Sequence, residues 1–428
     1  MIGYYRKAII DLKSQINELS KDMSNHELLL HIQLSLLKGI LNAERKITAL
    51  KTERKSLIVK RIRRGLSRRS SQALKYRISA LDRRITQYQW LRYLYRSFGD
   101  AIAFLYLDKW SIKPLLYDDS TAAVKQESGH LTAKQGLPAE LGLILDAKRH
   151  KVPALLTDLT NSIRYGDVCL LGGSVPELLE VKSSHNRNRR TTRQLSRLAN
   201  VQSYLKNDEG YNVRGAAFCQ RVNIRTPERN YVDQLNLSIG EALKTGHAIA
   251  RPEPGLHFLV QTPGAHLDYG EAFEHLISPV PFFLNEYKNK EWWMSYYPFT
   301  LTIRNPEHLY LFVKGDLFIL VIVDVGELIK LAARRQLTLT PLDDPVMAFQ
   351  IEGAPGYLKE PFLLKFSQHF FTRIALECLS LDWVLDITED HIAQLEDLFA
   401  RHDARMADPN DVRSSWDHLV VVPNPNGN

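Results

Sequence analysis

The sequence has few cysteines, no proline before Pro114 and no long apolar run, and these absences exclude several classes of protein. Cys169, Cys219 and Cys378 lie far apart within apolar stretches, which argues against a disulfide framework or a zinc site and favours reduced core thiols. The longest apolar run, LFILVIV at 317–323, is far shorter than the roughly 20 residues that cross a bilayer. The N-terminus also lacks the apolar block of a signal peptide. We therefore expect a cytoplasmic protein with no membrane partner.

The positive charge of the chain is concentrated at one end. The 428 residues carry a net charge of +8, but residues 1–100 hold 22 Lys and Arg against 8 Asp and Glu. The stretch KRIRRGLSRRSSQALKYR at 60–77 has many basic residues and no acid. Such a run is either a solvated helix surface or turn, or a contact with a polyanion such as nucleic acid.

Long helices are predicted for residues 1–110. Apolar residues recur at three- and four-residue spacing at Ile9, Leu12, Ile16 and Leu19, and again from Leu74 to Ile85. The pattern breaks near RRGLSRRSS at 63–71, where a glycine and several serines interrupt it. We expect a basic helical hairpin that acts as a spacer, a nucleic-acid clamp or a contact with a partner protein or a second copy of the chain.

The stretch YGDVCLLGGSVPELLEVKSS at 165–184 places Asp167 before one apolar strand and Glu180 and Lys182 at the end of the next. A Gly-Gly turn between the two strands would bring these charges together. Two carboxylates that share a pocket repel unless a cation lies between them. Oxygen ligands without histidine or cysteine suit Mg²⁺ or Mn²⁺, which can polarise a phosphodiester and activate water. The pattern therefore predicts metal-dependent phosphodiester hydrolysis.

A helix at 138–150 precedes this hairpin, and helices and strands alternate after it, so we expect an α/β fold with a mixed sheet and helices on its faces. Further towards the C-terminus the apolar runs predict strands followed by two helices. The predicted strands lie at 255–261, 299–304, 309–315, 317–325 and 346–353.

The acid before one strand and the acid-x-lysine on the next resemble the PD-(D/E)XK nuclease superfamily, which has a restriction-endonuclease-like fold. The resemblance covers residues 132–265. It implies that Asp167 and Glu180 hold the metal, that Lys182 is the catalytic lysine, and that an acid on the preceding helix completes the site. Glu140 is the best-placed match for that acid, with Asp158 and Asp146 as alternatives. The sequence departs from the family pattern at Gly166, where the motif has its proline.

The resemblance also implies a glutamine on the helix after the lysine. Gln194 occupies such a place, and Gln202 is the alternative. The segment from 182 to 197 has six basic residues and no acid, so it would lie where a phosphate must arrive. The predicted nucleic-acid contacts are Arg187, Arg189, Arg190, Arg193 and Arg197, together with Arg63, Arg64, Arg68 and Arg69 of the N-terminal region.

These inferences divide the chain into five regions: a basic helical hairpin at 1–110, a polar linker at 111–136, a nuclease-like core at 137–265, a C-terminal α/β module at 266–415 and a disordered tail at 416–428. The predicted function is a metal-dependent endonuclease that uses Mg²⁺ or Mn²⁺, with DNA favoured over RNA, in genome defence or DNA processing. Two alternatives stay open. One is a ribonuclease, and the other is a non-catalytic nucleic-acid-binding or assembly protein that keeps the nuclease fold.

Overall fold

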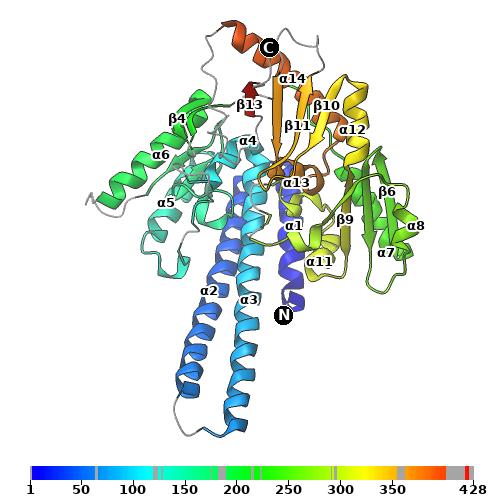
Figure 1. The fold of residues 1–428 in the computed structure, drawn as a ribbon. Helices are drawn as coiled ribbons and strands as arrows, with labels where there is room; N and C mark the ends of the chain where they lie inside the picture. Colours follow the sequence, from blue (N-terminus) through cyan, green and yellow to red (C-terminus); the bar gives the residue numbers. More distant parts are fainter. Residues whose placement is uncertain are drawn as a thin grey trace. The chain divides into compact units, whose positions relative to one another are not determined.

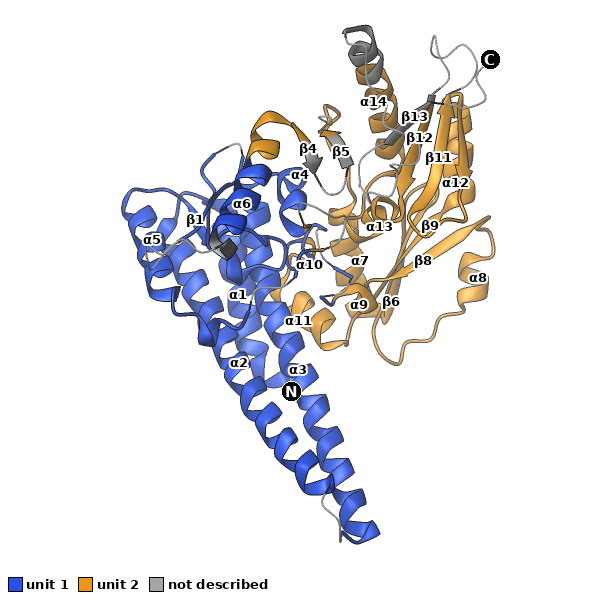
Figure 2. Ribbon diagram, turned by 60° about the vertical axis from the view of Figure 1, so that its left-hand side comes forward, with its two compact units in different colours: residues 1–116, 125–202, 289–301 blue, residues 117–124, 203–288, 302–428 orange. Residues whose placement is uncertain are grey.

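The computed structural model describes residues 2–62, 66–118, 124–126, 129–173, 175–181, 189–213, 216–221, 224–290, 292–293, 296–353, 362–401 and 420–423. The fold is mixed α/β, as predicted (Figure 1). The chain forms two compact units (Figure 2). Unit 1 contains residues 1–116, 125–202 and 289–301, and unit 2 contains residues 117–124, 203–288 and 302–428.

Unit 1 is built around the long helices that the apolar spacing predicts. They are α1 (Arg6–Lys21), α2 (His26–Ile62) and α3 (Arg68–Tyr106), with a short 3-10 turn at Ile2–Tyr5 before α1. α2 and α3 form a hairpin, and Ser67 caps α3 by accepting a hydrogen bond from the backbone N–H of Ser70. The helix break therefore falls within the predicted stretch.

The rest of unit 1 consists of shorter helices, 3-10 turns and strands. They are α4 (Lys109–Ile112), η2 (Lys113–Leu116), η3 (Leu131–Ala133), α5 (Leu137–Arg149), β1 (Ala154–Leu156), η4 (Thr157–Leu159), β2 (Val168–Leu170), β3 (Glu177–Leu179) and most of α6 (Arg189–Asn207). The segment 289–301 also belongs to unit 1 and includes the start of α10 (Phe299–Thr302). Trp293, Tyr296 and Phe299 of this segment are buried.

β1, β2 and β3 form a small antiparallel sheet in that order. Its central row, Leu155, Cys169 and Leu178, is almost fully buried. The Gln33 side chain of helix α2 forms hydrogen bonds with the backbone at the outer edge of β1. Its amide donates to Ala154 O (2.9 Å) and accepts from Leu156 N (3.0 Å). The buried edge of the sheet therefore keeps its hydrogen bonds, because an unpaired backbone group there would cost stability.

Unit 2 contains three antiparallel sheets, with strand orders β4-β5, β6-β7-β9-β8 and β10-β11-β12-β13. The strands are β4 (Glu209–Val213), β5 (Ala216–Gln220), β6 (His247–Glu253), β7 (Leu256–Gln261), β8 (Pro279–Phe283), β9 (Phe318–Asp324), β10 (Leu337–Pro341), β11 (Met347–Gly353), β12 (Phe362–Ser367) and β13 (Val420–Pro423). The helices are α7 (Val232–Thr245), α8 (Tyr269–Phe273), α9 (Leu284–Tyr287), α11 (Pro306–Lys314), α12 (Val325–Arg334), α13 (Gln368–Leu376) and α14 (Leu381–Arg401).

The strand pairing corrects the predicted mixed sheet. Every strand pair within the described ranges is antiparallel, and β4 pairs with β5 and not with the sheet of β1 to β3. Only two residues separate β4 from β5, and a connection of that length joins antiparallel neighbours, whereas a parallel pair needs a long crossover. The unit boundary at 202/203 also falls inside the range predicted as one core.

Two predicted strands are helices. The run at 299–304 contains α10, and residues 309–314 of the other run lie in α11. Asn305 caps α11, Pro306 occupies its first turn, and Gly315 ends it in the left-handed conformation. Short apolar runs fit a strand and a buried helix equally well, and here the flanking residues indicated a helix.

Three further findings bear on the sequence predictions. Cys169, Cys219 and Cys378 are free and buried, as expected of core thiols. β13 lies within the range predicted to be disordered and pairs with β12. None of the helices in the described ranges is both long enough and apolar enough to cross a membrane.

Candidate functional site

The hairpin of β2 and β3 places Asp167 and Glu180 on neighbouring segments of the chain. Val168 pairs with Leu179 in antiparallel register, so Asp167, just before Val168, and Glu180, just after Leu179, lie at the same end of the hairpin. Gly166 has a φ of +68°, and a Cβ on it would lie 2.9 Å from Leu179 O. Proline fixes φ near about −65°, so the family's proline could not adopt this backbone. The departure from the motif therefore has a local structural reason.

Asp167 is held rigidly at this end of the hairpin. Its backbone N–H donates to Leu179 O (2.7 Å), and its Oδ2 accepts from the backbone N–H of Val181 (2.9 Å). Its other oxygen, Oδ1, accepts a hydrogen bond from Lys134 Nζ at 2.8 Å. The carboxylate thus bridges the end of β3 and a lysine that lies 33 residues earlier in the chain.

Lys134 is the centre of a cluster of three acids from three elements. Its Nζ lies 2.7 Å from Asp158 Oδ2 in η4, 2.8 Å from Asp167 Oδ1 and 3.0 Å from Glu140 Oε1 in α5. The Glu140 and Asp158 side chains are buried, and about a quarter of the Lys134 side chain is exposed. Three carboxylates therefore surround one ammonium group, and solvent can reach the lysine side chain that carries it.

Burial and charge act in opposite directions within the acid cluster. Burial raises the pKa of Glu140 and outweighs the stabilising effect of Lys134, while the charges of Asp167 and Asp158 raise the pKa further. For Lys134, burial alone would lower the pKa, but the carboxylates of Asp158 and Asp167 outweigh it and raise the pKa. Lys134 consequently stays protonated and offsets part of the negative charge around it.

Helix α2 anchors the segment that carries Lys134. The buried Glu44 accepts a hydrogen bond from Thr132 N at 3.0 Å, and Arg92 and His130 lie 3.7 and 3.8 Å from its oxygens. Helix α3 holds the opposite side of the cluster, because Arg96 Nε donates to Asp158 O at 3.1 Å. The long helices thus position both the lysine and one of its acids.

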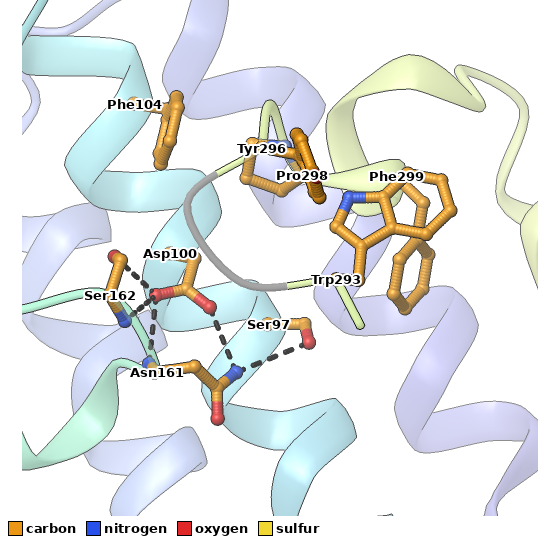
Figure 3. Close-up of a pocket in the computed structure, with 9 residues that line it drawn as sticks. All are labelled: Ser97, Asp100, Phe104, Asn161, Ser162, Trp293, Tyr296, Pro298 and Phe299. Carbon is orange, nitrogen blue, oxygen red and sulfur yellow. Dashed lines mark hydrogen bonds between the residues drawn. The ribbon is translucent and has the colours of Figure 1, made fainter. Parts of the chain in front are cut away.

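A buried network on α3 fixes the loop between Asp158 and Asp167 (Figure 3). Asp100 accepts hydrogen bonds from the backbone N–H and hydroxyl of Ser162, and from the backbone N–H and side-chain amide of Asn161, at 2.6–2.9 Å. Burial raises the pKa of Asp100 although these donors lower it. The adjacent cavity has a volume of only about 10 Å³, which is room for no more than one water. Asp100 therefore supports the loop and does not line a ligand pocket.

The structure brings some of the predicted site residues together and leaves others apart. Asp167, Glu140 and the alternative acid Asp158 meet at Lys134, whereas Asp146 pairs with Arg149 at the surface. Glu180 directly follows β3, is half-buried and is not among the acids that pair with Lys134, and Lys182 lies outside the described residues. Gln194 is exposed, while the other candidate glutamine, Gln202, donates to Leu178 O of β3 at 2.8 Å.

The predicted nucleic-acid contacts are only partly described. Arg63, Arg64 and Arg187 lie outside the described residues, as do the side chains of Arg189 and Arg190. Of the remaining predicted contacts, Arg68, Arg69 and Arg193 are exposed, and Arg197 is half-buried.

Sequence reasoning missed Lys134. It lies in the stretch predicted to be a polar linker, 24 residues before Asp158 in the chain, and no spacing relates it to the hairpin. The only available signal was a lysine shortly before a helix with an acid in its first turn. A long-range contact of this kind follows from the packing of both η3 and α5 against α2.

Glu140, Asp158 and Asp167 fit a divalent cation by their chemistry. Among the described residues, however, no group of three or more His, Cys, Asp or Glu side chains has a metal-ligating arrangement. The three acids contact the Lys134 ammonium instead. Their N–O distances of 2.7–3.0 Å are those of ion pairs with an ammonium and exceed the about 2.0–2.1 Å of Mg²⁺–oxygen bonds. In the structure the Lys134 ammonium is the cation that these three carboxylates contact.

Comparisons of this chain with protein-family models, with curated proteins and with solved structures found no match.

Proposed function

We propose that the chain is a divalent-metal-dependent nuclease with DNA as its favoured substrate. The observation that supports this most is that the carboxylates of Glu140, Asp158 and Asp167 all contact one ammonium group, that of Lys134. Carboxylates that face one another are costly unless a cation neutralises them, and hard oxygen ligands suit Mg²⁺ or Mn²⁺. The cluster lies at the end of the hairpin where Glu180 and Lys182 follow in the sequence.

In this proposal the carboxylates of Asp167, Asp158 and Glu140 would hold the metal, and Glu180 would be a further ligand, as the resemblance to PD-(D/E)XK nucleases implies. A bound Mg²⁺ supplies Lewis-acid polarisation of a phosphodiester and lowers the pKa of a water ligand. The hydrogen bond from Val181 N fixes the orientation of Asp167 in advance, which favours a preorganised site. Lys182 would contribute a positive charge near the phosphate, as the resemblance to PD-(D/E)XK nucleases implies.

Lys134 has a distinct part in the proposal. Its ammonium occupies the position that a metal ion would take, so metal entry would require the lysine side chain to swing out. The exposed part of the side chain gives it a route towards solvent. The acid cluster would thus keep a counter-ion in the absence of metal.

A second candidate is a non-catalytic nucleic-acid-binding protein that keeps the acid cluster for stability alone. Its supporting observation is that Lys134 contacts all three acids at once, which already compensates for much of their burial. On this alternative the lysine never leaves and no metal binds.

A cleavage assay separates the two candidates. Purified protein is incubated with plasmid, linear duplex DNA, single-stranded DNA and RNA in Mg²⁺, Mn²⁺, Ca²⁺ or EDTA, with Asp167→Asn as the matched control for a contaminating nuclease. The nuclease proposal expects cleavage in Mg²⁺ or Mn²⁺ and little in Ca²⁺, because the looser coordination of Ca²⁺ positions water poorly. Full activity in EDTA, or equal activity of Asp167→Asn, would reject it. Cleavage of RNA alone would show that the substrate is RNA. Genome defence or DNA processing would then no longer be the proposed biological role.

A further inference from the structure

At the far end of the α2–α3 hairpin, residues 51–80, the described residues form no buried core of their own. The last buried residue of α2 is Leu50 and the first of α3 is Leu81, so none of the described residues between them is buried. Figure 2 shows this end of the hairpin, here called the hairpin tip, running away from the other elements of unit 1. The tip is therefore a pair of helices that contact solvent on almost every side.

The helices of the tip hold together through a narrow contact. The contact consists of four half-buried residues, Leu57, Ile58, Leu74 and Ile78. Two ion pairs also join the two helices. Arg54 pairs with Asp82, and Arg77 Nη2 lies 2.7 Å from Glu53 Oε1. These contacts give the tip a defined shape although it adds nothing to the core.

The charge of the tip is almost entirely of one sign. Residues 51–80 contain eleven Lys and Arg and a single acid, Glu53, which is already paired with Arg77. Seven exposed cations of the tip form no ion pair within the part of the chain that the structure describes: Lys51, Lys55, Lys60, Arg61, Arg68, Arg69 and Lys75. Their mutual repulsion opposes the helical hairpin unless a polyanion approaches.

The placement of two of these cations is unfavourable for the helix itself. Arg68 and Arg69 lie in the first turn of α3, which contains no acid. The helix macrodipole is positive at that end and disfavours cations there. Helix stability therefore does not explain the position of Arg68 and Arg69, whereas contact with an external anion would explain it.

We infer that the hairpin tip is a docking surface for the phosphate backbone of nucleic acid, with duplex DNA as the partner. The choice of partner rests on the proposed nuclease function. Residues 51–62 of α2 extend about 18 Å, and duplex DNA presents one phosphate charge per about 1.7 Å of axis, so cations along this length can neutralise several phosphates. The contacts are to the backbone and carry no base specificity.

The test measures binding and does not need cleavage. A variant with Lys60, Arg61, Arg68 and Arg69 changed to Gln is compared with a control that carries Lys7, Lys38, Lys244 and Arg334 changed to Gln, four exposed cations elsewhere with the same total charge. Affinity for a duplex of about 30 base pairs is measured in EDTA across a salt series. The tip variant should bind at least about tenfold more weakly, and its log–log salt slope should fall by up to about 3.6, since each phosphate contact contributes about 0.9. The control should keep the parental slope.

Several outcomes would overturn the inference. Parental affinity and slope in the tip variant, or an equal loss in the control, would show that the tip makes no special contact with DNA. Retained DNA binding with loss of binding to phosphatidylserine vesicles would assign the tip to a membrane surface, which Ile62 and Tyr76, 76% and 68% exposed, would then contact. A tip variant that only changes from dimer to monomer in light scattering would assign it to a second copy. If the parent binds but never cleaves, the nuclease proposal fails while the docking surface stands.

Discussion

Lys134 and Asp167 form an ion pair 2.8 Å long between a segment anchored on helix α2 and the start of strand β2. The same ammonium also contacts Asp158 and Glu140, so removing or replacing this one charge affects three carboxylates. The relationship makes the cluster testable through stability as well as through activity.

Replacing Lys134 by methionine should destabilise the protein in EDTA and make it more responsive to divalent ions. Without the ammonium the three carboxylates repel, and loss of one partner of a partly buried ion pair costs about 1–3 kcal/mol. Mg²⁺ or Mn²⁺ should then raise the melting temperature of Lys134→Met by more than that of the parent, because a bound cation relieves the repulsion. Thermal denaturation with and without metal measures both effects.

Lys148→Met is the matched control for that experiment. Lys148 has a similar exposed fraction, 29% against 27%, but its only ion pair with described residues is with Glu27. It should change stability by well under 1 kcal/mol and add no response to metal. A Lys134→Met protein as stable as this control, and equally indifferent to Mn²⁺, would show that the three acids do not form a cation site.

Asp167→Asn and Lys182→Ala should both reduce cleavage by about 100-fold or more, but they should differ in binding. Asp167 places negative charge where a phosphate must approach, so its neutralisation removes a repulsion in the absence of metal. Lys182 supplies an attraction that its truncation removes. Asp167→Asn should therefore bind DNA in EDTA as well as the parent or better, and Lys182→Ala more weakly. Parental cleavage rates in both folded variants would exclude the hairpin from catalysis.

Gly99→Ala should destabilise unit 1 strongly. A Cβ on Gly99 would lie 1.9 Å from Leu159 O, so the loop that follows Asp158 would have to move away from α3. Overpacking of this kind costs about 1–3 kcal/mol or more. The control is Gly142→Ala in α5, where the added Cβ meets no atom within 4 Å and helix propensity favours alanine by about 1 kcal/mol. Urea denaturation should show opposite signs for the two, and equal stability would contradict this close packing.

His257 in unit 2 should make stability depend on pH. Burial lowers its pKa to about 4, Arg251 and His275 lower it as well, and Asp324 opposes them. Between pH 6.5 and 4 the unfolded chain therefore binds more protons than the folded one, so stability falls as the pH falls through this range. In His257→Phe this part of the pH dependence of the unfolding free energy should disappear, whereas the exposed His150→Phe should retain it. Parallel curves for His257→Phe and the parent would contradict the assignment.

Periodic features of the fold could be predicted from the sequence, but the ambiguous apolar runs could not. The spacing of Ile9, Leu12, Ile16 and Leu19 predicted a helix, and all four are buried on α1. The run at 309–315 was predicted to be a strand, but Asn305 and Pro306 begin a helix there. Local patterns specify an element reliably only when they extend over several turns or carry clear end signals.

The sequence by itself determined the long N-terminal helices, the concentration of positive charge at 60–77 and the position of Asp167 and Glu180 on consecutive apolar segments, because each depends on neighbouring residues. Only the tertiary structure decided which acids meet. Asp158 joins Asp167 and Asp146 does not, since η4 packs against α3 while Asp146 pairs with Arg149 at the surface of α5. It also decided that Lys134 lies among them, because Glu44 of α2 binds the backbone beside it. Contacts between residues far apart in the chain depend on packing, which no local pattern records.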